Sequence, residues 1–380
     1  MISMNKKKII RAVTVSMSVG FFKPMVKDLQ HKGYEVVTVS SSGPELEGLR
    51  ELGVRTIEVP MERRMSPLKD LKSLWHLIRV FRKERPYMVH SMTPKAGLLC
   101  MLAAWLTRVP RRVHTFTGLV WPTSKGLSRK ILMFTDWLTC ACATHVNPEG
   151  EGVKQDLQQH ITKKPMRVLG FGNVRGVDMD KFSRRPVVMN LARQLRNDGT
   201  FTFLFVGRIA RDKGLDELVA AFTRLTEQYD YVRLILVGWN EHDIDPVREK
   251  TLLQIKNSPC IDFVGSKYGD ELLAYYAASD CFVFPSYREG FPNTVMEAGA
   301  MDLPCIVTDI NGSREIIEEG KNGVIIPSKN VDALYKAMEH MMTDRESYNR
   351  YAKNARPMIA SRFEQGFVRK CLYDFYDEIM

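Results

Sequence analysis

Short apolar runs alternate with longer stretches of helical periodicity over residues 1–173. Each run is followed by apolar positions three or four residues apart, which is typical of a strand that leads into an amphipathic helix. Such βαβα order implies a parallel sheet with helices on both faces. The predicted strands are residues 9–16, 35–40, 55–59, 87–90, 112–116 and 166–169, and the predicted helices are residues 22–32, 45–52, 67–83, 96–107 and 127–145.

The same alternation starts again after a break in the pattern. Residues 171–200 are rich in Gly, Arg, Pro and Asp, and strands are predicted beyond them at 202–206, 233–237, 261–264, 281–284, 305–308 and 323–326. We therefore predict an α/β chain with two doubly wound parallel sheets, in which ligands bind at the carboxyl ends of the strands. The predicted domains are residues 1–173 and 200–362, joined by a linker at 174–199, and an amphipathic helix at 363–380 is expected to pack back on the first domain.

The composition is that of an ordinary globular protein. The chain has 380 residues, of which 44% are hydrophobic and 26% are charged, enough for two domains with separate cores. Its seven cysteines form no CxxC pair, which favours buried thiols in a reducing cytosol. The basic, apolar N-terminus lacks a small-residue cleavage site, and the uncharged apolar run 96–107 is too short to span a bilayer, so neither a signal peptide nor a transmembrane helix is expected.

Charge is divided unevenly between the two halves. Residues 1–170 hold 28 basic and 13 acidic residues, whereas the remaining residues hold 27 and 31. A basic first half indicates an anionic partner, and nucleic acid, a phosphorylated lipid and an anionic membrane surface all fit. The helix predicted at 67–83 combines an apolar stripe with five basic residues. It is either a surface helix with a solvated basic face or a helix that lies on an anionic leaflet.

Two short segments of the second half have the residues of an anion site. Gly207 and Arg208 follow the strand 202–206, and Lys213 and Gly214 precede a helix that begins near Leu215. Arginine offers a planar fork, lysine a point charge, and glycine lets the backbone approach an anion. This pattern predicts a diphosphate site, although basic residues near helix starts are common on ordinary surfaces.

The loop after the strand 281–284 adds two carboxylates. Glu289 lies in the loop, and Glu297 lies about one turn into a helix for which Asn293 is the expected N-cap. Carboxylates repel a phosphate but accept hydrogen bonds, so sugar hydroxyls are their natural partners. The alternative is that both are solvated surface charges.

Together, Gly-Arg-x4-Lys-Gly at 207–214 and Glu-x7-Glu at 289–297 resemble the retaining glycosyltransferases of family 4, which have the GT-B fold. The resemblance implies two Rossmann-like domains with a cleft between them and covers nearly the whole chain. Segments 18–23, 63–67, 93–97, 117–119 and 176–178 are similar to the branch that serves capsule, exopolysaccharide and protein glycosylation. Enzymes of that branch are N-acetylgalactosaminyl- and galactosyltransferases that extend undecaprenyl-diphosphate-linked sugars. The resemblance therefore implies a UDP-sugar donor, a lipid-linked saccharide acceptor, and a cytoplasmic enzyme held peripherally at the inner membrane.

The resemblance also implies a role for each matching donor-side residue. Arg208 and Lys213 would hold the diphosphate and stabilise the charge on the leaving nucleotide, Glu297 would accept hydrogen bonds from the ribose, and Glu289 would contact the donor sugar. The remaining predicted nucleotide-sugar contacts are Gly20, Gly207, the backbone of Asn293 and Thr294, and Val264, against which the uracil would lie.

The acceptor side is predicted from the basic first half. Arg63, Arg64 and Lys95 are the candidates for the lipid diphosphate. Thr117 stands where many family members have a histidine, so it could donate a hydrogen bond but carry no charge. The nearest histidine, His114, is expected to be a packed or hydrogen-bonded core residue.

We expect no metal and no other cofactor. The Asp-x-Asp triplets 178–180 and 243–245 do not follow the kind of strand that a metal-bound nucleotide would need, and the two cations already supply positive charge. Two rival functions stay open. One is a UDP-sugar 2-epimerase of the same fold, and the other is a nucleic-acid-binding protein, for which the basic pI of about 9.2 is the only support.

Overall fold

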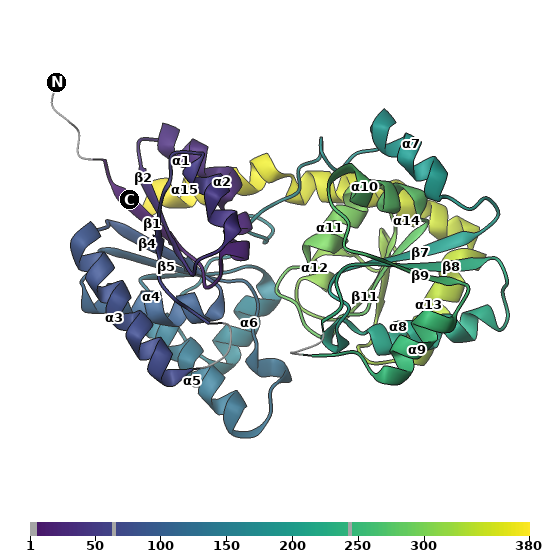
Figure 1. Cartoon of the computed structure of the whole chain (residues 1–380), viewed down its shortest axis with the longest axis horizontal. Coiled ribbons are helices and arrows are strands. Elements are labelled where there is room, and N and C mark those ends of the chain that lie inside the picture. Colours follow the sequence, from purple (N-terminus) through teal and green to yellow (C-terminus); the bar gives the residue numbers. More distant parts are fainter. Residues whose placement is uncertain (1–5, 63–65, 242–244) are drawn as a thin grey trace. The chain divides into compact units, whose positions relative to one another are not determined.

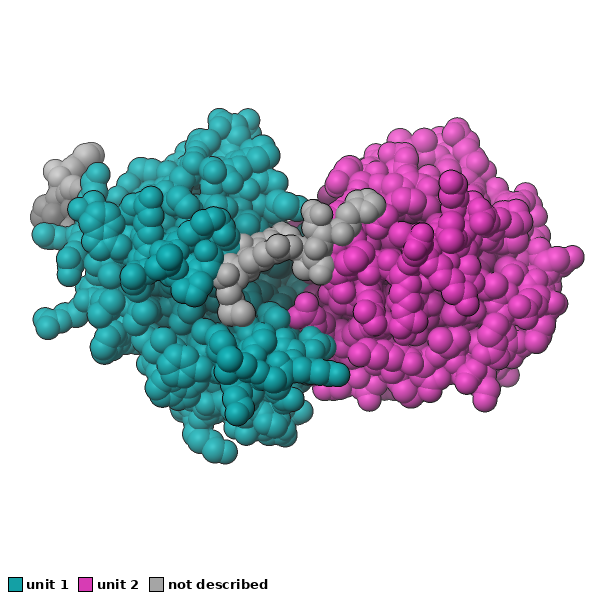
Figure 2. Space-filling view, turned by 60° about the horizontal axis from the view of Figure 1, so that its bottom comes forward, with its two compact units in different colours: residues 1–175, 368–380 teal, residues 176–367 magenta. Residues whose placement is uncertain are grey.

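The computed structural model describes residues 6–62, 66–241 and 245–380. The chain divides into two compact units, which Figure 2 colours separately. Unit 1 comprises Met1–Arg175 and Val368–Met380, and unit 2 comprises Gly176–Phe367. Across the described residues each unit has one six-stranded parallel sheet, so the predicted doubly wound α/β fold is confirmed.

The sheet of unit 1 has the strand order β3-β2-β1-β4-β5-β6. Strands β1 to β3 extend the sheet to one side and β4 to β6 extend it to the other, so the topological switch point, at which doubly wound sheets bind ligands, lies between β1 and β4. The strands are β1 (Lys8–Ala12), β2 (Glu35–Ser40), β3 (Arg55–Glu58), β4 (Met88–Met92), β5 (Arg111–Phe116) and β6 (His145–Pro148).

Helices cover both faces of this sheet. One face packs against α3 (Pro67–Glu84), α4 (Pro94–Leu106), α5 (Gly126–Cys142) and α6 (Glu151–His160). The other packs against α1 (Val26–His31), α2 (Glu47–Arg50) and α15 (Gln365–Ile379), which lie together in Figure 1. Short 3-10 helices are Ser16–Phe21, Lys23–Met25, Pro44–Leu46 and Trp121–Thr123. The last helix thus completes the core of unit 1, and Tyr373 donates a hydrogen bond to Asp28 of α1 at 2.6 Å.

One predicted strand of unit 1 is wrong. The sixth strand is β6, whereas residues 166–169 form no strand and only the Arg167 amide reaches β6, at the Val146 carbonyl. The predicted helix 127–145 also ends earlier, at Cys142. The strand β6 escapes prediction because its sequence, His-Val-Asn-Pro, lacks an apolar run. Its proline is tolerated because the strand is at the edge of the sheet.

The sheet of unit 2 has the matching order β12-β11-β10-β7-β8-β9, and its switch point lies between β7 and β10. All six strands fall where the sequence predicts them: β7 (Phe201–Val206), β8 (Val232–Val237), β9 (Ile261–Gly265), β10 (Cys281–Phe284), β11 (Cys305–Thr308) and β12 (Gly323–Ile326). The helices are α7 (Pro186–Leu195), α8 (Leu215–Thr226), α9 (Glu249–Asn257), α10 (Gly269–Ala278), α11 (Asn293–Ala300), α12 (Ser313–Ile316), α13 (Val331–Thr343) and α14 (Arg345–Phe363), with a 3-10 turn at Arg211–Lys213. Helix α7 lies inside the segment predicted as a linker and packs on α10. Among the described residues, none of the helices is long and apolar enough to cross a membrane.

Candidate functional site

The candidate site of unit 2 lies at the switch point between β7 and β10. These strands are neighbours in the sheet, so the loops that leave their carboxyl ends start side by side. Gly207 and Arg208 follow β7, and the loop 285–292 follows β10 and leads into α11. The topology therefore brings together two motifs that are about 80 residues apart in the sequence.

Gly214 allows the loop after β7 to pack closely against the loop after β10. Gly214 has φ of +73° at the start of α8, and a Cβ at this position would overlap the carbonyl oxygen of Pro285. The Tyr287 amide also donates to the carbonyl of Asp212 at 2.8 Å. Only glycine combines this left-handed backbone with so close an approach. The loop that contains Lys213 is thereby held against the loop that contains Glu289.

Cations and carboxylates alternate through this site. Lys213 pairs with Glu289, and their side chains are only 13% and 16% exposed. Arg208 lies 3.2 Å from an oxygen of Asp212 and 3.5 Å from an oxygen of the buried Glu241. Each predicted diphosphate ligand is thus held by an acidic neighbour. An anion that binds either cation must displace the paired carboxylate, which then needs another hydrogen-bond donor.

The two motif carboxylates have different surroundings. Glu289 accepts a hydrogen bond from Ser286 at 2.8 Å in addition to its ion pair with Lys213. Glu297 is buried, and the hydroxyl of Tyr276 donates to it at 3.4 Å. Burial raises the pKa of Tyr276 well above its usual value, so this hydroxyl keeps its proton at neutral pH.

Helix α11 begins one residue away from the predicted cap. Its N-cap is Pro292, and Asn293 is already the first helical residue, so the predicted capping role of Asn293 is wrong. Proline is favoured here because the loop enters the helix with an extended backbone. Asn293 and Thr294 nevertheless lie in the first turn, where backbone N–H groups point out of the helix end.

Val264 lines a cavity of about 420 Å³ at the ends of three neighbouring strands. Ile209 follows β7, Asn240 follows β8, and Phe263 and Val264 belong to β9. The remaining lining comes from Leu252, Ile255, Lys256, Ile261 and Asp262. The cavity begins one residue beyond Arg208 and is mostly apolar, so a flat heterocycle fits its chemistry.

The predicted residues of unit 1 lie around the switch point of its own sheet. Gly20 is in the 3-10 helix Ser16–Phe21, where a Cβ would meet no atom of the described chain within 4 Å. Lys95 lies in the first turn of α4 and pairs with Asp70 at 2.7 Å, with its side chain 10% exposed. Thr117 is half-buried just beyond β5. Arg63 and Arg64 lie outside the described residues.

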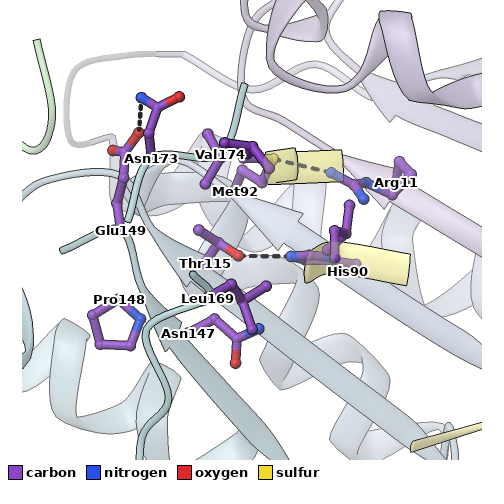
Figure 3. Close-up of a pocket in the computed structure, with 12 residues that line it drawn as sticks. Arg11, His90, Met92, Thr115, Asn147, Pro148, Glu149, Leu169, Asn173 and Val174 are labelled. Atoms are coloured by element: carbon purple, nitrogen blue, oxygen red, sulfur yellow. Dashed lines mark hydrogen bonds between the residues drawn. The ribbon is translucent and has the colours of Figure 1, made fainter. Parts of the chain in front are cut away.

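A row of buried polar side chains crosses the sheet of unit 1 beneath α15 (Figure 3). Arg11, His90, Thr115 and Asn147 come from β1, β4, β5 and β6, and His90 lies 2.8 Å from the Thr115 hydroxyl. The cavity beside them measures about 20 Å³. That volume has room for about one water molecule, so it cannot hold a sugar or a nucleotide.

His114 is a core residue, as the sequence predicts. It is 1% exposed, its Nδ1 lies 2.9 Å from the Ser91 hydroxyl, and its ring meets Phe116 edge-on. Burial lowers the pKa of His114 to about 3, so the ring is neutral. It faces Gly97 of α4, where a Cβ would overlap the imidazole.

The first aspartate triplet has a structural role. Asp178 accepts hydrogen bonds from the amides of Asp180 and Lys181 at 3.1 and 3.0 Å, which is a turn of the Asx type. Asp243 lies outside the described residues, and Asp245 accepts from the Asp212 amide at 2.7 Å. Over the described chain, no group of three or more His, Cys, Asp or Glu residues is arranged to hold a metal.

Sequence comparison assigns both units. The family model "Glycosyl transferase 4-like domain" matches residues 22–172, and the model "Glycosyl transferases group 1" matches residues 190–358. A capsular polysaccharide biosynthesis glycosyltransferase, CapM of Staphylococcus aureus, is 30% identical over 380 residues, which cover 99% of this chain and 98% of that protein. The chain belongs to the group 1 glycosyltransferases. The predicted resemblance is therefore confirmed at the level of the family.

One further relative and one solved structure extend the comparison. An Escherichia coli enzyme named UDP-Gal:alpha-D-GlcNAc-diphosphoundecaprenol alpha-1,3-galactosyltransferase is 30% identical over 334 residues, covering 85% of this chain and 83% of that protein. The crystal structure of Anabaena HepE in complex with UDP-glucose superposes with a TM-score of 0.80 at 17% identity, covering 98% of this chain and 99% of that one. The latter likeness concerns the fold alone, and it agrees with the predicted GT-B class.

Sequence reasoning missed three residues of the candidate site. Asp212 and Glu241 accept the two ends of the Arg208 guanidinium, and Ser286 binds Glu289. Arg208 and Asp212 are four residues apart, but they do not share a helical turn, because the 3-10 turn begins only at Arg211. Glu241 follows another strand, and nothing in the sequence marks it.

Proposed function

We propose that this glycosyltransferase is a retaining hexosyltransferase. It moves a hexose or N-acetylhexosamine from a UDP-sugar to an undecaprenyl-diphosphate-linked saccharide, in the assembly of a bacterial surface polysaccharide or glycan. The observation that carries the proposal is the pairing of Lys213 with Glu289 beside Arg208, at the switch point of unit 2. The names of the Staphylococcus and Escherichia relatives support the polysaccharide and the lipid-linked acceptor.

The donor diphosphate would replace the acidic partners of the two cations. Lys213 would turn from Glu289 to the diphosphate, and Arg208 would present its planar guanidinium to the same group. As the bond to the sugar breaks, negative charge grows on the leaving UDP, and both cations then stabilise it more strongly than in the ground state. The same exchange would free Glu289 to accept hydrogen bonds from the sugar.

The remaining contacts follow from the surroundings of each residue. Glu297, oriented by Tyr276, would accept hydrogen bonds from the ribose hydroxyls. The uracil would enter the cavity beside Val264. After that exchange Glu289 would stay bonded to Ser286 and bind the sugar hydroxyls, so it is not assigned as a covalent nucleophile. We therefore expect front-face attack guided by the leaving diphosphate and retention of the anomeric configuration. The reaction is proposed to need no metal, because the two cations supply the positive charge.

The acceptor is proposed to be bound by unit 1, with the protein held peripherally at the inner face of the cytoplasmic membrane. Lys95 and Thr117, with Arg63 and Arg64, are its proposed contacts. Because Lys95 pairs with Asp70, the acceptor diphosphate would have to displace that carboxylate.

The test is a donor screen with the purified protein. UDP-galactose, UDP-glucose and their two N-acetylated analogues are each mixed with a short-chain polyprenyl-diphosphate-linked N-acetylglucosamine, with and without EDTA. We expect one donor to be consumed, EDTA to have no effect, and NMR to show that the product keeps the donor's anomeric configuration. An inverted product or complete loss of turnover with EDTA would overturn the mechanism. Conversion of free UDP-N-acetylglucosamine without acceptor would instead indicate the epimerase, and tight, steeply salt-dependent binding of DNA or RNA would indicate the nucleic-acid-binding protein.

A further inference from the structure

Helix α5 turns an apolar face outward. Leu127, Ile131, Phe134 and Trp137 recur at intervals of three or four residues, and all four are exposed, Leu127 to 73%. Phe134 and Trp137 stack on each other with ring centroids 5.7 Å apart. The opposite side of the helix is also apolar, because Leu132, Met133 and Leu138 pack against the core of unit 1. The helix is therefore apolar on its exposed side as well as on its buried side, and such an exposed face marks an interaction surface.

The neighbouring helices extend this apolar surface. Helix α4 packs between α3 and α5, and the three helices cover one face of the sheet of unit 1 (Figure 1). Leu68 of α3 is 86% exposed, and further large apolar side chains are exposed on α3 and at the end of α4. We call this surface the α3–α5 face, and its exposed apolar members are Leu68, Leu71, Trp75, Trp105, Leu106, Leu127, Ile131, Phe134 and Trp137.

The exposed charges of the same three helices are basic. Their acidic residues are Asp70, Glu84 and Asp136, and none of these is exposed. Asp70 is paired with Lys95, and Glu84 is buried against Lys8. The exposed basic residues are Lys69, Lys72, Arg79, Arg82, Lys83, Arg129 and Lys130. A large apolar surface is thus surrounded by positive charge.

We infer that the α3–α5 face is the surface by which this protein docks on an anionic lipid bilayer. The apolar side chains would enter the boundary between headgroups and acyl chains, while the lysines and arginines meet lipid phosphates. This inference rests on the proposed lipid-linked acceptor and deepens it by naming the surface that brings the enzyme to its substrate. The charges favour a bilayer over a second copy of the chain, because symmetric pairing through this face would bring cations against cations.

The experiment measures binding of the full-length protein to lipid vesicles. One set of vesicles contains phosphatidylglycerol and phosphatidylcholine, and the other contains phosphatidylcholine alone. We expect co-sedimentation with the anionic vesicles only, and quenching of tryptophan fluorescence by brominated acyl chains, since Trp75, Trp105 and Trp137 lie on the face. The double variant Ile131→Glu/Phe134→Glu should weaken binding by more than about tenfold, because each large apolar side chain that enters the bilayer contributes at least that much.

Matched controls separate this face from general surface effects. Val187 is exposed on α7 of unit 2, and Val187→Glu should bind vesicles as the wild type does. Replacing Lys72 and Arg82 by glutamine should weaken binding about fivefold for each cation removed. UDP-induced thermal stabilisation of the double variant should match the wild type, which shows that it is folded.

The outcomes distinguish the inference from the proposed function. Equal vesicle binding by wild type and double variant, or no vesicle binding by the wild type, would overturn the inference even if the lipid-linked acceptor is glycosylated. A concentration-dependent dimer that the double variant abolishes, without vesicle binding, would assign the face to a second copy of the chain. Vesicle binding through this face without any sugar transfer would overturn the proposed function alone.

Discussion

Lys213→Met tests whether the cation of the central ion pair acts on the reaction or only on the fold. The substitution keeps an unbranched aliphatic side chain and removes the ammonium group, whose nitrogen lies 5.6 Å from the centre of the Phe284 ring. It leaves the Glu289 carboxylate largely buried but still bonded to Ser286 at 2.8 Å. We therefore expect the free energy of unfolding to fall by only about 1–3 kcal/mol.

The loss of activity should be larger than this change in stability can explain. A domain of ordinary stability stays almost fully folded after such a loss. If Lys213 stabilises the leaving diphosphate, kcat should fall by about 10²–10³-fold, as for removal of one preorganised charge-stabilising group. Arg208→Ala should have a similar effect. Urea unfolding and initial-rate kinetics on the same preparations give both numbers.

A second substitution separates the two contributions. In Lys213→Met/Glu289→Gln the uncompensated carboxylate is gone, so stability should recover by about 1 kcal/mol or more while activity stays low. Arg224→Met is the matched control, because Arg224 of α8 forms an exposed ion pair with Asp332 of α13. Its loss should change neither quantity by more than about 0.5 kcal/mol. A kcat for Lys213→Met within tenfold of the wild type, or activity restored by the double variant, would refute the assigned role.

Three further predictions concern single positions. Gly214→Ala should destabilise the protein by at least about 1–2 kcal/mol and weaken UDP binding, because it strains the left-handed backbone and pushes against Pro285. A wild-type melting temperature together with a wild-type shift of that temperature by UDP would contradict this. Gly97→Ala should cost about 1–3 kcal/mol in urea unfolding through overlap with His114, although alanine normally stabilises a helix, and a stabilising effect would show that the ring can move. Burial raises the pKa of Asp136 to about 7, so the native state binds this proton more tightly than the unfolded state, and its stability should fall as pH rises from about 4 to 7. In Asp136→Asn the free energy of unfolding should lose about 2–3 kcal/mol less than in the wild type between pH 5 and pH 8. Equal pH dependence of the unfolding free energy in urea titrations of both proteins would refute the assignment.

The strands of unit 2 were predictable because each is an apolar run between polar segments. Strands buried on both faces of a parallel sheet need such runs, and β7 and β8 have no competing interpretation. The strand β6 lacks that signature, since its position is set by pairing with β5 and not by its own hydrophobicity. The sixth strand was therefore predicted at the apolar segment 166–169 instead of at β6.

The sequence indicated which residues meet at the candidate site, but not which acidic residue pairs with which cation. A motif gives residue types at fixed spacing, and the order of the strands then places Arg208, Lys213 and Glu289 at one switch point. Which acid neutralises which cation depends on loop conformations, and these are fixed by contacts such as that of Gly214 with Pro285. The exposed apolar face of α5 was missed for a related reason: a helical stripe in a sequence predicts a buried face, and only packing shows which side is covered.

Under the proposed function and the inferred membrane-docking face, the distribution of charge follows from two binding problems. A soluble nucleotide sugar needs a few cations in a fixed, half-buried geometry, and unit 2 provides Arg208 and Lys213 among acidic neighbours although the second half of the chain is slightly acidic overall. A lipid surface needs many cations without fixed geometry, and the first half of the chain provides them on exposed helices. Exposed charges are screened beyond about 8 Å at physiological salt, whereas half-buried pairs are screened much less. Under the proposed function, the protein's hold on a membrane would therefore respond to ionic strength more strongly than its grip on the donor.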